Sequence, residues 1–125
     1  MALTNERGFT LLELLLVVAI ITVLAAIAIP HYAETRARSL DTQVVSAVRQ
    51  VATGEEAYYA GRQRYTSALE DLDGLVLGGV AITVQGGNSG DLGSSFRVHG
   101  TTAGAAHSYV WVSDPPPGDP HLVAD

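Results

Sequence analysis

The sequence predicts an α+β protein in which a long N-terminal helix packs, in its second half, on a small antiparallel β-sheet. Three observations support this prediction. An apolar run extends from Phe9 to Ile29, helical spacing of apolar residues continues to about residue 60, and apolar residues alternate at period two beyond Gly74. Because neither an amphipathic helix nor a one-sided sheet buries its apolar surface alone, we expect the two to cover each other.

The apolar run is long enough to cross a membrane. Its twenty-one residues from Phe9 to Ile29 contain one ionisable side chain, Glu13, and as a helix they would span a hydrocarbon layer of about 30 Å. A secretory signal peptide has a shorter apolar segment of about 7–15 residues before its small-residue cleavage site. Residues 25–28 could be read as such a site, but they close a run that is already too long. Cleavage between Gly8 and Phe9 would instead leave the whole run on the mature protein.

Glu13 is the residue in this run that needs a charged or hydrogen-bonding partner. A carboxylate within a transmembrane segment costs a few kcal/mol, so such groups usually pair or line a functional site. Cleavage after Gly8 would create a cation, the amine of Phe9. Four residues of helix rise about 6 Å, which keeps Glu13 from folding comfortably onto its own terminus, whereas the amine of a neighbouring chain could lie beside it and neutralise both charges. The alternative is a glutamate near the membrane face that snorkels or is protonated.

The N-terminal residues resemble those of the type IV pilin family, which includes the pseudopilins of type II secretion. The resemblance rests on Arg7-Gly8, on Phe9-Thr10-Leu11-Leu12-Glu13 and on the apolar helix that reaches Pro30. It implies that a prepilin peptidase cuts between Gly8 and Phe9, that the new Phe9 amine is N-methylated, and that Phe9 and Glu13 act in assembly. It also implies a precursor in the inner membrane, from which an inner-membrane assembly machinery builds an extracellular helical filament of identical chains.

Three parts are therefore predicted: a leader over residues 1–8, a transmembrane or filament-core half-helix over 9–30, and a soluble globular domain over 31–125. Pro30 should break or kink the helix, because it lacks an N–H and its ring clashes with the preceding turn. Beyond it, the helix should end at about Tyr59 or Ala60, with Gly61 as the left-handed residue after it. The apolar stripe of this second half comprises Ala33, Ala37, Leu40, Val44, Val48 and Val51.

Three short strands are expected over residues 80–85, 96–99 and 109–112, separated by the turn-rich segments 86–93 and 100–106. The tail over residues 114–125 contains four prolines, so it should run extended over the surface and make no central strand. Paired aromatics near the helix end again resemble pilins. We expect Tyr58, Tyr59 and Tyr65 to cap the core where helix meets sheet.

Composition excludes several classes of function. The chain of 125 residues has no cysteine, so no disulfide can staple it, and its formal charge of −6 argues against direct nucleic-acid binding. No catalytic, cofactor or metal site is predicted. The candidate metal ligands His99, His107, His121, Asp114 and Asp119 lack ligand spacing, and neither a phosphate loop nor a Gly-x-Ser-x-Gly motif is present.

We therefore expect a structural subunit of a type IV pilus that serves adhesion, twitching motility or DNA uptake, among which the sequence does not choose. One alternative is a pseudopilin forming a short periplasmic piston. Major pseudopilins commonly carry a calcium site in their C-terminal loops. Residues 114–119 of this chain contain too many prolines to form such a site convincingly. The other alternative is a single-pass anchored binding module that never polymerises, in which Glu13→Ala would be harmless or mildly stabilising in the bilayer.

Overall fold

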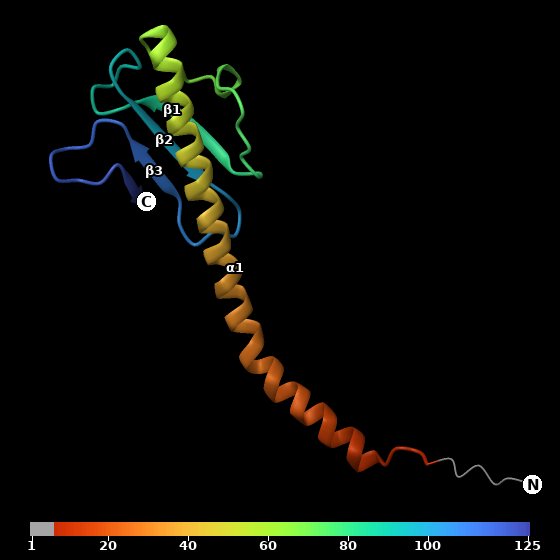
Figure 1. Ribbon diagram of the computed structural model, residues 1–125. Helices are drawn as coiled ribbons and strands as arrows, with labels where there is room; N and C mark the ends of the chain where they lie inside the picture. Colours follow the sequence, from red (N-terminus) through yellow and green to blue (C-terminus); the bar gives the residue numbers. More distant parts are fainter. Residues whose placement is uncertain (1–6) are drawn as a thin grey trace, which may run out of the picture. The chain divides into compact units, whose positions relative to one another are not determined.

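The computed structural model describes residues 7–125 and confirms the predicted α+β fold. The chain divides into two compact units that meet between Thr35 and Arg36. One helix, α1 (Leu11–Arg62), contributes to both units (Figure 1). By length and composition it is the one helix among the described residues that could cross a membrane.

In the N-terminal unit, α1 continues through Pro30. The helix therefore has no break at Pro30 in the single chain, and the kink expected there stays a prediction. A proline removes one backbone hydrogen bond of the ladder, and the turns on both sides, apolar before Pro30 and largely polar after it, keep helical geometry. A local loosening of the helix at Pro30 inside an assembly stays a prediction.

In the C-terminal unit, one stripe of α1 is buried: Asp41, Val44, Ala47, Val48, Val51, Ala52 and Glu55. The predicted stripe is confirmed at its three valines, whereas Ala33 is exposed. The predicted helix end is wrong by a few residues. The helix passes through Gly61 to Arg62, and Gln63 takes the left-handed conformation with φ 56°. The Gln63 N–H donates to the carbonyl oxygen of Tyr59 at 2.8 Å, which gives a C-terminal cap without glycine.

Four antiparallel strands form the sheet in the order β1-β2-β3-β4: β1 (Ala81–Gly86), β2 (Phe96–Thr101), β3 (Tyr109–Val112) and β4 (Leu122–Ala124). The first three are the predicted strands. The fourth corrects the expectation for the tail, because its last residues pair with β3 beyond the final proline. As an edge strand, β4 needs a partner on one side only, which is compatible with the prolines before it.

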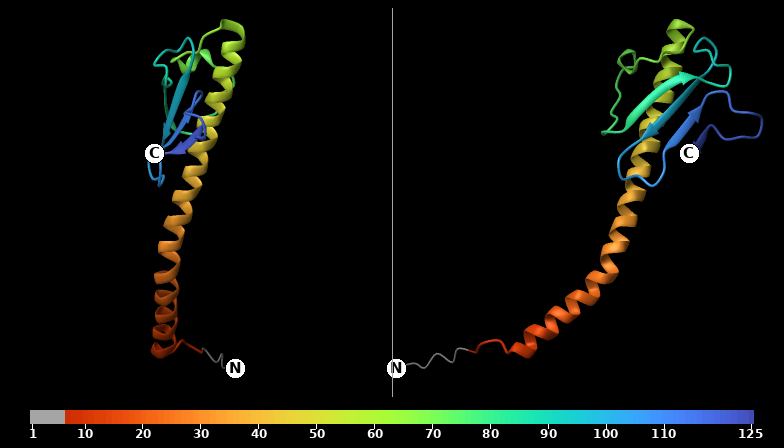
Figure 2. Two further views of the ribbon diagram at one scale, coloured as in Figure 1. Left: turned by 90° about the vertical axis from the view of Figure 1, so that its left-hand side faces the viewer. Right: turned by 180° about the vertical axis from the view of Figure 1, so that it is seen from behind.

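The sheet lies against one side of α1 within this unit (Figure 2). Val84 and Val98 face each other across β1 and β2 and are buried against the helix stripe. The core is closed by aromatic rings that pack on one another. Tyr65 lies 4.7 Å from Tyr59 and 4.6 Å from Phe96 between ring centroids. The prediction that tyrosines cap the core at the helix end is thus confirmed, because Tyr65 is buried in the core and both Tyr58 and Tyr59 pack against it.

A long segment between helix and sheet contains the short 3-10 helix η1 (Leu69–Asp71). Behind it, Leu72 is buried and lies on Gly54, where its side chain would touch an added Cβ at 3.5 Å. This distance is an ordinary van der Waals contact, so Leu72 packs directly on the surface of the helix at Gly54. The segment therefore closes the core on the side away from β3 and β4.

Candidate assembly site

The helix begins with a reciprocal hydrogen-bond arrangement between Thr10 and Glu13. The Thr10 backbone N–H donates to Glu13 Oε2 at 2.9 Å, and the Thr10 hydroxyl lies 3.1 Å from the same oxygen. In return, the Glu13 backbone N–H donates to Thr10 Oγ1 at 3.1 Å. This is a capping box, in which a threonine N-cap and a glutamate three residues later satisfy each other's backbone donors.

The capping box shows that the Glu13 carboxylate bends back toward the N-terminus of its own helix. The donor in this contact is the Thr10 N–H, so the expectation that Glu13 does not fold back onto the Phe9 amine stays a prediction. The Thr-x-x-Glu pattern ahead of an apolar run could have revealed this contact. Carboxylate oxygen Oε1 makes no hydrogen bond within residues 7–125, so one oxygen serves the cap and the other is available.

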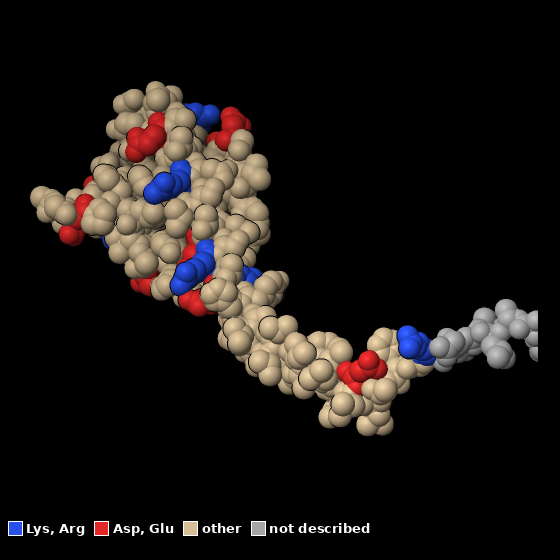
Figure 3. Space-filling model, turned by 60° about the horizontal axis from the view of Figure 1, so that its bottom comes forward, with Lys and Arg blue, Asp and Glu red and all other residues tan. Residues whose placement is uncertain are grey.

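Apolar side chains cover the rest of the N-terminal unit and have almost no protein neighbours there. The exposed fraction is 89% for Phe9, 76% for Leu12 and 70% for Ile27. Figure 3 shows this stretch as a tan surface almost free of charged side chains. Burying one leucine or isoleucine side chain is worth about 1.5–3 kcal/mol, so such a surface requires lipid or protein around it.

Gly8 and Phe9 lie outside the helix, in an exposed non-helical segment. An extended, accessible peptide bond is what a protease requires of its substrate. Residues 1–6 of the predicted leader lie outside the described residues. The structure thus places Gly8, Phe9 and Glu13 within one short segment at the start of α1, and Pro30 farther along the same helix.

The histidines and aspartates considered as metal ligands lie apart from one another. The Nδ1 atom of His107 is 3.0 Å from Asp41 Oδ2, whereas His99 Nε2 lies 3.7 Å from Asp125 Oδ2. His121 stacks on Trp111. Among residues 7–125, no group of three or more histidine, cysteine or acidic side chains could hold a metal ion.

The N-terminal segment also matches known proteins. Residues 3–29 fit the family model of the prokaryotic N-terminal methylation motif. The resemblance to type IV pilins is confirmed. The chain is 38% identical over 68 residues to the type IV major pilin of Myxococcus xanthus, covering 54% of this chain and 31% of that protein.

Two further pilins show the same pattern. The major component of the type IV wide pilus of Thermus thermophilus is 43% identical over 63 residues, which are 50% of this chain and 48% of that protein. A fimbrial protein of Pseudomonas aeruginosa is 48% identical over 64 residues, which are 50% of this chain and 42% of that pilin. The matches thus span about a third to a half of the length of these relatives, which are named as structural pilus proteins rather than enzymes.

Proposed function

We propose that this chain is a structural subunit of a type IV pilus, polymerised through the first half of α1. The observation that carries the proposal is the exposed apolar surface from Phe9 to Ile29, headed by the Glu13 carboxylate, whose Oε1 makes no hydrogen bond with residues 7–125. A filament core satisfies both features, because neighbouring helices cover the apolar side chains. A lipid bilayer covers the same side chains before assembly and offers no specific partner for Glu13.

Processing would prepare the chain for this contact. Prepilin peptidase would cut the exposed bond between Gly8 and Phe9, and methylation would follow on the new Phe9 amine. That amine would stand next to Thr10, the residue that caps the helix. In the filament, the amine of one subunit would approach the free Oε1 of Glu13 in the next, while Oε2 keeps the cap of its own helix.

The location of the chain would change between the precursor and the assembled filament. The precursor would sit in the inner membrane by the apolar half of α1, with the C-terminal unit outside the cytoplasm. The inner-membrane assembly machinery would then move the subunit into an extracellular filament. Such a filament would serve adhesion, twitching motility or DNA uptake.

The capping box makes the proposal testable with two matched variants. Glu13→Gln keeps an acceptor for Thr10 and removes the charge, whereas Thr10→Ala removes the cap and keeps the charge. If Glu13 pairs with a neighbour's amine, Glu13→Gln should lower the yield of sheared surface filaments at least tenfold. Thr10→Ala should lower it only modestly, since a cap is worth about 1 kcal/mol. Immunoblots of the membrane fraction control for the amount of subunit.

The opposite ranking would assign Glu13 to helix capping alone. A processed subunit that stays in the membrane fraction, without surface filaments from the unaltered chain, would favour the periplasmic pseudopilin. Equal yields from all three chains would show that the charge of Glu13 has no part in assembly.

A further inference from the structure

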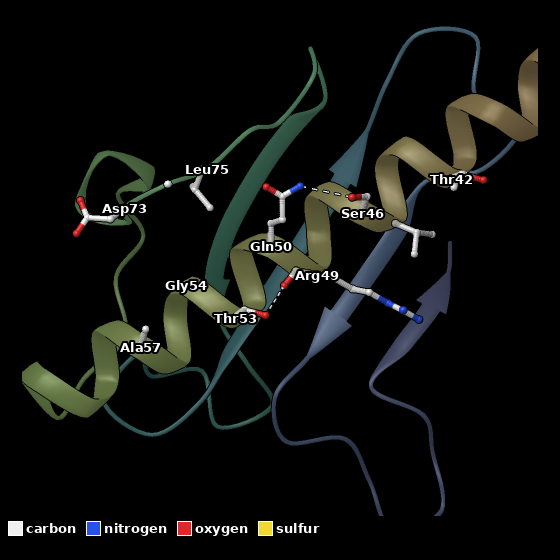
Figure 4. Close-up of a pocket in the computed structure, with 11 residues that line it drawn as sticks. Thr42, Ser46, Arg49, Gln50, Thr53, Gly54, Ala57, Asp73 and Leu75 are labelled. Carbon is white, nitrogen blue, oxygen red and sulfur yellow. Dashed lines mark hydrogen bonds between the residues drawn. The ribbon is translucent and has the colours of Figure 1, made fainter.

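A groove of about 340 Å³ runs between α1 and the edge of the sheet formed by β3 and β4, and we refer to it as the Trp111 groove. Its helix wall comprises Arg49, Ala52, Thr53 and Glu56, which share one helix face at spacings of three and four. Its other wall is Trp111. Figure 4 shows Arg49 pointing away from Asp73 and Leu75, which lie on the other side of the helix.

Trp111 is held firmly in this position. It pairs with Val98 on β2 and with Leu122 on β4, so its side chain lies on the face of the sheet that covers α1. The ring of His121 stacks on it at 5.4 Å and 23°, and His121 is fixed in turn by its Nδ1 contact of 2.8 Å to the carbonyl oxygen of Val112. The half-buried indole thus forms a rigid wall of the groove.

The loop between β3 and β4 projects from the same unit (Figures 1 and 2). Residues 116–120 are exposed. The Asp119 N–H donates to the carbonyl oxygen of Pro116 at 3.0 Å, and Gly118 has φ 95°. Proline at the second position and glycine with positive φ at the third define a type II turn. Prolines also restrict the unbound loop, so little conformational entropy remains to be lost on binding.

We propose that the projecting loop of one subunit, Pro115–Pro120, docks in the Trp111 groove of a neighbouring copy, with Asp119 facing Arg49. The proposal rests on the proposed function, since it describes a second contact between subunits of the same filament. Proline-rich segments bind grooves lined by aromatic side chains, because they are already ordered and their rings pack on flat surfaces.

Charge complementarity selects this occupant and its orientation. The Arg49 guanidinium makes no ion pair with the described part of the chain, and Asp119 likewise has no ion-pair partner there. The loop over residues 113–120 carries two acidic residues and no basic one, but the Asp114 carboxylate is already used by the Asn88 backbone N–H at 3.1 Å. Glu56 also lines the groove, two helical turns from Arg49. Its carboxylate would repel Asp119, so Asp119 should lie at the end of the groove that contains Arg49.

Along a filament the loop of each subunit would enter the groove of the next one, so the proposed contact is heterologous. A heterologous contact that does not close into a ring propagates as a helical filament. The loop contact would thereby add a connection between globular units to the one made by the apolar helices.

The absence of cysteine in the chain allows a direct test by crosslinking. In filaments of the double variant Thr53→Cys with Asp119→Cys, mild oxidation should produce a ladder of disulfide-linked oligomers on a denaturing gel. Each single-cysteine variant should give no ladder. The control pair, Thr53→Cys with Thr101→Cys, places the second thiol on an exposed site at the end of β2 and should also give none.

Charge exchange tests the same contact without new thiols. Arg49→Glu and Asp119→Arg should each lower the yield of filaments at least threefold, and the double variant should restore most of it. Filaments that form without a ladder, or a double variant no better than the singles, would overturn the loop contact and leave the filament function intact. Loss of filaments in the unaltered chain would instead overturn the proposed function.

Discussion

Two buried carboxylates on α1, Asp41 and Glu55, lie in environments that shift their pKa values in opposite directions. Asp41 accepts backbone N–H bonds from Ala106 at 2.8 Å and from His107 at 3.1 Å. The side-chain hydrogen bond with His107 is the main cause that lowers the pKa of Asp41. These hydrogen bonds connect the helix to the loop between β2 and β3, so Asp41 holds that loop against α1.

Glu55 is fully buried and has fewer partners. Its Oε2 accepts the Thr66 N–H at 3.0 Å, whereas Oε1 is buried without a hydrogen bond in the described structure. Burial raises the pKa of Glu55, against the smaller opposing effect of the Thr66 N–H. The folded state therefore disfavours the ionised form of Glu55. The contribution of Glu55 to the free energy of unfolding is largest below the ordinary glutamate pKa and falls as pH rises above that value.

The environment of Asp41 predicts how stability depends on pH. Because its pKa is lower in the folded state, the stabilisation is present above the ordinary aspartate pKa and is lost as pH falls through the lowered value. Asp41→Asn should reduce the urea midpoint at pH 7 and flatten the decline of stability below pH 4. The fluorescence of Trp111, the single tryptophan, reports unfolding of the full chain in detergent.

The matched control is Asp73→Asn, since Asp73 is exposed on the loop after η1. This variant should follow the unaltered chain at every pH. Parallel pH curves for Asp41→Asn and the unaltered chain would show that the bonds of Asp41 do not contribute to stability.

At the scale of elements, the close approach of α1 and β2 depends on Gly100. A Cβ at this position would collide with Cγ2 of Val48 and lie 3.1 Å from Cδ1 of Ile82. Helix and strand thus approach each other more closely than an alanine would allow. The glycine was assigned to a turn in the sequence analysis, whereas it lies within β2.

Gly100→Ala should therefore destabilise the C-terminal unit by about 1–3 kcal/mol, the usual cost of overpacking a core. Gly61→Ala is the control. Gly61 lies inside α1 with open space around it, and alanine there should be neutral or stabilising by up to about 1 kcal/mol. Urea unfolding of both variants checks the pair, and a neutral Gly100→Ala would contradict the packing of β2 on Val48.

Much of this architecture could be predicted because its signals are local. The period of the apolar residues indicated α1 and three of the strands, and the Phe9 to Glu13 motif indicated the assembly segment. Features set by tertiary contacts could not be predicted in this way. The predicted apolar stripe does not include Asp41, because its partners Ala106 and His107 lie more than sixty residues away in the sequence. Likewise, β4 is stabilised by pairing with β3 rather than by its own propensity.

At the scale of the whole molecule, the two units present different surfaces for assembly. The N-terminal unit offers apolar side chains and one carboxylate oxygen. The C-terminal unit offers a groove that contains Arg49 and a projecting loop that contains Asp119. The first would supply most of the binding free energy through burial, and the second would fix the orientation of neighbouring subunits.

The central claim is that the chain is cut after Gly8 and polymerises. Intact-mass spectrometry of protein sheared from the surface of the native host, with electron microscopy of the same fraction, tests it most directly. We expect thin filaments whose subunit begins at Phe9 and is heavier by one methyl group. A subunit that still carries residues 1–8, without filaments in that fraction, would contradict the claim and favour a membrane-anchored binding module.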